Sequence, residues 1–149
     1  MIPQSYTRKI ILETGEEYFG FGFGANADRV VELVFNTSMV GYQEIISDPS
    51  YTNQGVVMTY PLIGNYGMNR DDYETVFPTI GGLIVREYND FPSNFRSSST
   101  LSDVLKCHQI PGICGIDTRK LARSIRNHGS RKALLTKVDM PLETGLTIL

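Results

Sequence analysis

The chain has few of the side chains that carry catalytic chemistry or bind metals. Its 149 residues include two cysteines, Cys107 and Cys114, and two histidines, His108 and His128. Their spacing matches no zinc motif, so we expect no metal site. The two cysteines could pair by number, but thiols inside cells usually stay reduced, and we expect no disulfide. A chain of this length buries about two thirds of its unfolded surface, so its stability needs neither a disulfide nor a metal.

Long apolar runs and a large charge of either sign are also missing. No stretch approaches the roughly 20 apolar residues of a membrane span, and residues 1–13 lack the apolar core of a signal peptide. We therefore expect a cytoplasmic protein with no membrane partner. The net charge of -2 and the apolar fraction of 41% are typical of a soluble globular protein. The length predicts one domain over residues 1–149.

Positive charge is concentrated in one segment. Residues 117–132 hold six lysines and arginines against a single acid, Asp117. Arg119, Arg123 and Arg126 recur at helical spacing and share one face. Nucleic-acid binding would need a more basic domain and stacking aromatics among the charges, and this segment has no aromatic residue. We expect a solvated helix face and no nucleic-acid partner.

Predicted strands and helices alternate loosely along the chain, which favours an α/β fold with mixed pairing. The expected strands cover residues 9–14, 16–24, 30–37, 54–60, 79–88, 112–116 and 132–136. The expected helices cover residues 42–46, 97–110 and 117–129, with a long loop over 61–78, a chain break at Pro111-Gly112 and a polar tail after 136.

Glycines predict the details of the N-terminal part. Gly15 lies between the first two expected strands and indicates a hairpin turn. Gly20, Gly22 and Gly24 recur at period two, so they permit close approach of another backbone. Their spacing is not the phosphate-binding GxGxxG pattern, and no long helix follows them.

The helix over 117–129 has the clearest signals. Asp117 is a good N-terminal cap, and Gly129 suits the C-terminal end. Leu121, Ala122 and Ile125 form the stripe that we expect to be buried.

The stretch FNTSMVGYQEIISDPSY, residues 35–51, has polar side chains at both ends of a strand–turn–helix unit. Asn36, Thr37 and Ser38 end the expected strand, and Asp48 and Ser50 flank a proline at the end of the helix. Clusters of this kind at strand ends often bind a ligand. The same residues also stabilise turns by bonding to their own backbone, so both interpretations stay open on the pattern alone.

Four blocks, taken together, resemble a known family. They are FNTSMVGYQEIISDPSY at 35–51, TYPLIGNYG at 59–67, PSNFR at 92–96 and GIDTRKLARSIRNHG at 115–129. In this order they resemble the small, glutamine-hydrolysing subunit of carbamoyl phosphate synthetase, from about Ile10 to Thr136. Val40 is a small departure, since the family often has threonine there.

The resemblance implies the N-terminal domain of that subunit. Its fold would be a swivelling β/β/α three-layer domain with mixed sheets. Ser50 would contact the substrate L-glutamine, because a hydroxyl can both donate and accept hydrogen bonds. The partner would be the large subunit, which carries ATP and metal, so no cofactor is expected in this domain.

The family's catalytic part has no counterpart in residues 1–149. The class I amidotransferase domain uses a Cys-His-Glu triad, with the cysteine in a Gly-x-Cys-x-Gly elbow. The nearest local pattern, Gly112-Ile113-Cys114-Gly115, has its second glycine one residue too early, and no His-x-Glu follows. A nucleophile needs a base within hydrogen-bond reach, so we expect no catalytic residue here.

The resemblance therefore implies a domain that is part of an enzyme without being catalytic alone. The intact subunit would supply ammonia for carbamoyl phosphate in arginine and pyrimidine synthesis. This domain would contribute to the glutamine site and to the association of the two subunits. The alternative is a non-enzymatic interaction module on the same fold, and the coding sequence beyond Leu149 would separate the two.

Overall fold

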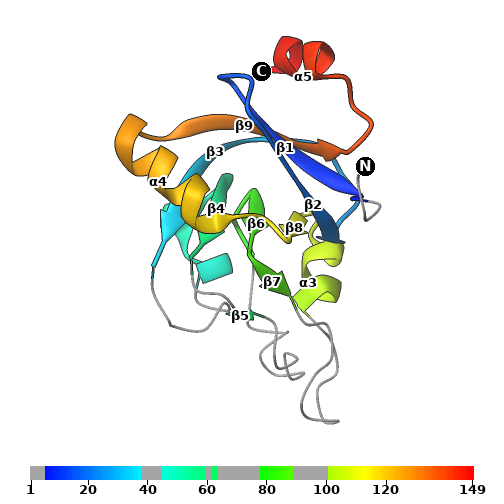
Figure 1. Cartoon of the computed structure of the whole chain (residues 1–149). Helices are drawn as coiled ribbons and strands as arrows, with labels where there is room; N and C mark the ends of the chain where they lie inside the picture. The colour runs from blue at the N-terminus through cyan, green and yellow to red at the C-terminus, as the bar shows by residue number, and fades with distance from the viewer. Residues whose placement is uncertain (1–5, 38–44, 60–61, 64–77, 89–100) are drawn as a thin grey trace, which may run out of the picture.

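Seven β-strands of the computed structural model close into a barrel (Figure 1). The structure describes residues 6–37, 45–59, 62–63, 78–88 and 101–149. In barrel order the strands are β1 (Arg8–Leu12), β2 (Glu17–Gly24), β8 (Pro111–Cys114), β6 (Gly82–Ile84), β4 (Gln54–Met58), β3 (Arg29–Asn36) and β9 (Arg131–Lys137). The other elements are the paired strands β5 (Leu62–Ile63) and β7 (Glu87–Tyr88), the 3-10 helix η1 (Pro49–Tyr51), and the helices α3 (Leu101–Cys107), α4 (Thr118–His128) and α5 (Leu142–Ile148).

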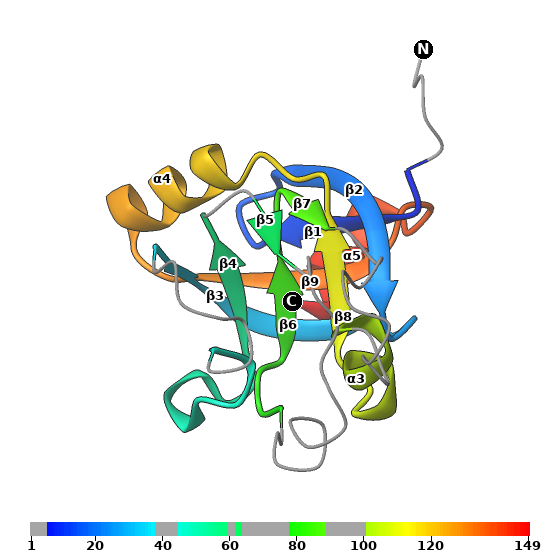
Figure 2. The same ribbon diagram turned by 90° about the horizontal axis from the view of Figure 1, so that it is seen from below.

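Pairing in the barrel is mixed. β3, β4, β6 and β8 run parallel to their neighbours in that group, whereas the β1–β2, β1–β9, β2–β8 and β3–β9 pairs are antiparallel. Figure 2 shows α3 and α4 on opposite sides of the barrel. The predicted α/β class with mixed pairing is confirmed. The finer description, a swivelling β/β/α three-layer domain, is not confirmed.

The barrel is buried on both faces where its strands are parallel. One apolar cluster draws on all seven barrel strands and on α4, whereas the other joins β4 and β6 to α3. Neighbouring residues Val56 and Val57 enter different clusters, as do Leu83 and Ile84. This alternation follows from the period of two in a strand, and it explains why residues 56–58 of β4 and residues 83–84 of β6 are unbroken apolar runs.

The glycine predictions are confirmed at Gly15, Gly20 and Gly24, whereas a Cβ at Gly22 would meet the side chain of Arg8 and not another backbone. Gly15 turns the chain with φ of 96°, and its N–H donates to the carbonyl of Leu12. A side chain at Gly20 would collide with the carbonyl oxygen of Cys114 in β8. At Gly24 a Cβ would lie 2.7 Å from the carbonyl oxygen of Ile110. The absence of side chains therefore lets β2 lie close to the chain around β8.

The predicted limits of α4 are also confirmed. The carboxylate of Asp117 accepts a hydrogen bond from the Lys120 N–H at 3.1 Å, and Gly129 ends the helix with φ of 83°. The predicted stripe of Leu121, Ala122 and Ile125 is buried.

Other expectations need correction. The strand over 79–88 is two strands, because the chain bends at Val85 and Arg86 between β6 and β7. Pro111 opens β8 rather than breaking the chain, a position where a missing N–H costs little. The expected polar tail forms α5, which packs against β1 with Gly145 touching Ile11.

The remaining expectations concern residues that the structure describes in part. Ile45 and Ile46 are helical, whereas the rest of the expected helix over 42–46 lies outside the described residues. Also outside the described residues are Ser38, residues 97–100 at the start of the expected helix over 97–110, and most of the loop over 61–78.

Candidate functional site

Ser50 lies in an exposed 3-10 turn shortly before β4. Asp48 precedes the turn with extended backbone, as expected for a residue before proline. The N–H of Ser50 donates to Oδ1 of Asp48 at 2.9 Å, and the Ser50 hydroxyl donates to the same oxygen at 2.8 Å. The sequence Asp-Pro-Ser thus forms its own cap, with the carboxylate facing the serine.

These two hydrogen bonds favour the ionised form of the Asp48 carboxylate. The backbone N–H of Ser50, followed by its hydroxyl, lowers the pKa of Asp48 below its usual value. Donors that face a carboxylate favour its charged form. Since an ionised carboxylate can only accept, the hydroxyl proton of Ser50 points to Asp48 and its lone pairs stay free to accept from another group.

The turn is held by neighbours from two other segments. Asn36, at the end of β3, donates from Nδ2 to the hydroxyl oxygen of Tyr51 at 2.9 Å. The hydroxyl of Thr79 donates to the carbonyl of Asp48 at 3.1 Å. The structure therefore brings the polar end of β3 beside the Asp48–Ser50 turn, a proximity that the sequence pattern did not predict. The contribution of Thr79 was missed, because nothing in the local sequence links it to residue 48.

Cys114 has an environment that suits a structural thiol. It ends β8, where it pairs with Phe21 of β2, so it lies on a regular β-ladder. Burial raises the pKa of the Cys114 thiol, which keeps it protonated and a weak nucleophile. Cys107 is exposed, and neither Cys107 nor Cys114 forms a disulfide.

Metal binding and membrane insertion find no support in the part of the chain that the structure describes. No three histidine, cysteine or acidic side chains there lie close enough together to share a metal ion. Among the described helices, none combines the length and the apolar character of a bilayer span.

A hollow beside the glycines of β2 was missed from the sequence. It has a volume of about 850 Å³ and lies between β2, α3 and the segment after β9. On one side the rings of Phe23 and Tyr88 stack with centroids 4.2 Å apart, and the hydroxyl oxygen of Tyr88 accepts from the N–H of Ser102 at 3.0 Å. Arg8, which also lines it, is already bonded to Asn26 and the carbonyl of Ala27. The guanidinium group of Arg8 is thus occupied by internal contacts.

The three arginines of α4 are all exposed, as expected. They do not share one environment, however. Arg119 and Arg123 line a hollow together with Lys120 and Arg86, whereas Arg126 lies over the ring of Phe35 at 5.8 Å. Arg86 was missed because it is far from α4 in sequence.

Comparison with known proteins defines a class: the small chains of a synthase. The family model described as "Carbamoyl-phosphate synthase small chain, CPSase domain" matches residues 10–135. The chain belongs to this carbamoyl-phosphate synthase small-chain family, which confirms the resemblance seen in the sequence.

Individual relatives agree with the family model. The carbamoyl phosphate synthase small chain of Oceanobacillus iheyensis is 59% identical over 128 residues, which cover 86% of this chain and 35% of the relative. The carbamoyl phosphate synthase pyrimidine-specific small chain of Halalkalibacterium halodurans is 56% identical over 136 residues, covering 91% of this chain and 38% of the relative. The small chain of Fusobacterium nucleatum is 57% identical over 134 residues, with coverage of 90% and 37%. The chain therefore spans little more than a third of the length of these relatives.

Proposed function

We propose that this chain is the N-terminal, non-catalytic domain of a glutamine-hydrolysing carbamoyl phosphate synthase small subunit. The observation that carries the proposal is the identity of 56–59% to such small chains over 35–38% of their length. Cys114, the nearest match to the family's nucleophile, lies partly buried in a barrel strand. Glutamine hydrolysis would then belong to a second domain, and this domain would complete the assembly that uses the ammonia.

The proposed assembly has a large subunit as partner and works in the cytoplasm. The large subunit would use ATP, a metal and bicarbonate to make carbamoyl phosphate, which feeds arginine and pyrimidine synthesis. The domain's own share would be to help form the glutamine site and to associate with the large subunit.

Ser50 is the residue proposed to face L-glutamine. Its hydroxyl is exposed and oriented by Asp48. Because its proton is directed to Asp48, the oxygen is free to accept a hydrogen bond from the α-ammonium group of glutamine. The ionised carboxylate of Asp48 lies beside that oxygen and favours the same positive charge. This pairing supports recognition of the amino end of the substrate.

The rest of the turn would keep Ser50 in place. The Asn36–Tyr51 and Thr79–Asp48 hydrogen bonds tie it to the end of β3 and to the segment before β6. A turn held from two sides loses little freedom on binding, which lowers the entropic cost of positioning a substrate.

The test is Ser50→Ala in a full-length small subunit that contains this domain. A lost hydrogen bond costs roughly 0.5–1.5 kcal/mol, so KM for glutamine should rise about two- to tenfold, with at most a small fall in the melting temperature because the Ser50–Asp48 side-chain bond is also lost. If Ser50 is only a turn residue, the melting temperature falls and KM does not move, which would remove Ser50 from the glutamine site.

A further inference from the structure

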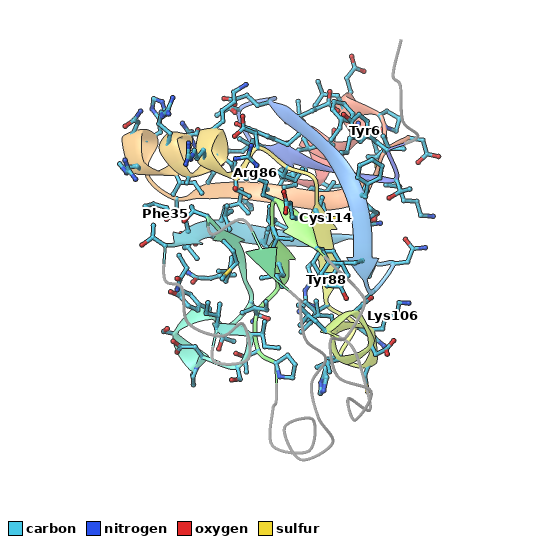
Figure 3. The ribbon with its side chains drawn as sticks, turned by 60° about the horizontal axis from the view of Figure 1, so that its bottom comes forward. Tyr6, Phe35, Arg86, Tyr88, Lys106 and Cys114 are labelled. Carbon is cyan, nitrogen blue, oxygen red and sulfur yellow. The ribbon has the colours of Figure 1, made fainter. Side chains whose placement is uncertain are left out.

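A hollow at the start of α4 is lined by four cations. Arg86 comes from the bend between β6 and β7, and Arg119, Lys120 and Arg123 come from the first two turns of α4. The hollow has a volume of about 480 Å³, and all four side chains are exposed. Figure 3 shows Arg86 beside the end of α4. The chain as a whole has a net charge of -2, so the positive charge of this hollow is opposite in sign to the net charge of the chain.

The carboxylate at the hollow is already engaged. Asp117 lines it, but its Oδ1 accepts the capping hydrogen bond from the Lys120 N–H at 3.1 Å. Among the described residues, the ion pairs are Arg8–Asp28 and Lys9–Glu17, and neither involves the hollow. The first turn of α4 adds the partial positive charge of a helix N-terminus. In the described part of the molecule the hollow therefore keeps a net positive charge, with four cations against the single carboxylate of Asp117.

The two walls of the hollow are joined by the backbone. The carbonyl of Arg86 accepts a hydrogen bond from the N–H of Gly115 at 3.0 Å, and Gly115 precedes the cap of α4 by two residues. Lys120 is steadied in turn by the ring of Tyr18, whose centroid lies 5.7 Å from Nζ. The backbone therefore holds the Arg86 side of the hollow next to the start of α4.

The spacing fits an extended acidic segment. Arg119 and Arg123 are one turn apart, which places them about 6 Å apart along the helix axis. Alternate side chains of an extended chain point the same way and lie about 6.7 Å apart. Two carboxylates at alternate positions can therefore each meet one arginine, and arginine binds carboxylates with two parallel hydrogen bonds.

We propose that this hollow, lined by Arg86, Arg119, Lys120 and Arg123, docks a carboxylate-rich segment of the large subunit. The identity of the partner rests on the proposed function, whereas the acidic chemistry rests on the hollow itself. Charge complementarity of this kind sets the orientation of docking and the rate of association. The open shape and the exposed donors suit a protein segment better than a small enclosed ligand.

The first test uses the chain alone. Hexaglutamate is titrated into the isotope-labelled protein at low salt, and amide NMR shifts are followed. We expect saturable shifts at the four lining residues, which weaken as salt rises. The double variant Arg86→Glu/Arg123→Glu should bind about tenfold more weakly, since each reversal replaces an attraction by a repulsion. Absence of localised shifts would overturn the proposal.

A matched control separates the hollow from overall charge. Lys106→Glu/Arg126→Glu makes the same change in net charge on exposed residues that lie outside this hollow. Its affinity for hexaglutamate should stay close to that of the unchanged chain. Equal weakening in both double variants would contradict a specific site. Tripolyphosphate is the second probe: if it fills the hollow while hexaglutamate does not bind, the site takes phosphate groups and the proposal is wrong.

The second test uses the large subunit with full-length small subunit. We expect Arg86→Glu/Arg123→Glu to slow association about tenfold and the control variant to leave it unchanged. If both variants associate equally well, the docking site is wrong and the proposed function stands. If no small subunit carrying this domain associates with the large subunit, the proposed function fails, and the docking proposal, which takes its partner from it, fails with it.

Discussion

Ser50 gives both its backbone N–H and its hydroxyl to a single oxygen of Asp48, at 2.9 and 2.8 Å. The carboxylate is thereby held ionised and the serine held in one orientation. The pair is local in sequence, exposed, and tied by Thr79 and Asn36 to segments that are distant along the chain.

The pH dependence of this pair follows from the lowered pKa of Asp48. An aspartate whose pKa is lower in the folded state stabilises the fold above its unfolded pKa of about 3.9. That contribution is lost as the pH falls through the lower, folded pKa. An NMR titration of the Asp48 carboxyl should show a midpoint below about 3.9.

The matched variant for this titration is Ser50→Ala, which removes the hydroxyl and keeps the N–H. The midpoint should rise part of the way, because the backbone N–H is the larger cause of the shift. A midpoint that does not move in the variant would show that the hydroxyl does not donate to Asp48.

Glutamine hydrolysis should be absent from the chain alone. The reason is that Cys114 lies in a barrel strand with its pKa raised by burial, so little thiolate is present at neutral pH. Glutamate release is measured with purified protein, with Cys107→Ser as the control for the exposed thiol. Turnover that disappears in Cys114→Ser and persists in Cys107→Ser would make Cys114 a nucleophile.

Local signals allowed much of the fold to be predicted. The hairpin at Gly15, the caps of α4 at Asp117 and Gly129, and the apolar strand β3 each depend on a few neighbouring residues, and each was correct. Closure of the barrel depends on the pairing of β1 with β9, which are more than a hundred residues apart. Pattern reasoning carries no information on that pairing.

The residues around Ser50 and those around the cationic hollow also differ in whether the sequence could predict them. Asp48 and Ser50 stand out in the sequence because Asp-Pro-Ser is a turn signal. Arg86 does not stand out, and it meets α4 only because β6 and β8 are parallel neighbours. The helix α5 was missed because its residues, including Gly145 and two threonines, are weak helix formers. Packing of Gly145 against β1 stabilises it instead.

Gly20→Ala should destabilise the barrel strongly. A Cβ at this position would collide with the carbonyl of Cys114, so β2 and β8 would have to separate. Overpacking of this kind costs about 1–3 kcal/mol or more, read as a drop in the midpoint of urea denaturation. Thr14→Ala, in the exposed turn, is the control and should change the free energy of unfolding by less than about 0.5 kcal/mol. Equal midpoints for both variants would show that the backbone relaxes around residue 20.

Asp117→Ala should separate two roles of one carboxylate. As the cap of α4 it accepts a hydrogen bond from the Lys120 N–H, and its loss should cost about 0.5–2 kcal/mol in the free energy of unfolding. Asp117 is also the acid that lines the hollow of Arg86, Arg119 and Arg123. Its removal should therefore strengthen binding of hexaglutamate even as the fold becomes less stable.

Asp117→Asn is the matched variant for this pair of effects. An asparagine side chain still accepts the capping hydrogen bond, so stability should be largely retained. The negative charge is lost in both variants, so both should bind hexaglutamate more tightly than the unchanged chain. Thermal denaturation and NMR titration of the same three proteins measure the two effects separately. If neither variant binds hexaglutamate more tightly, the charge of Asp117 does not act on the hollow. If both variants lose the same amount of stability, the cap depends on the charge of Asp117 rather than on its hydrogen bond.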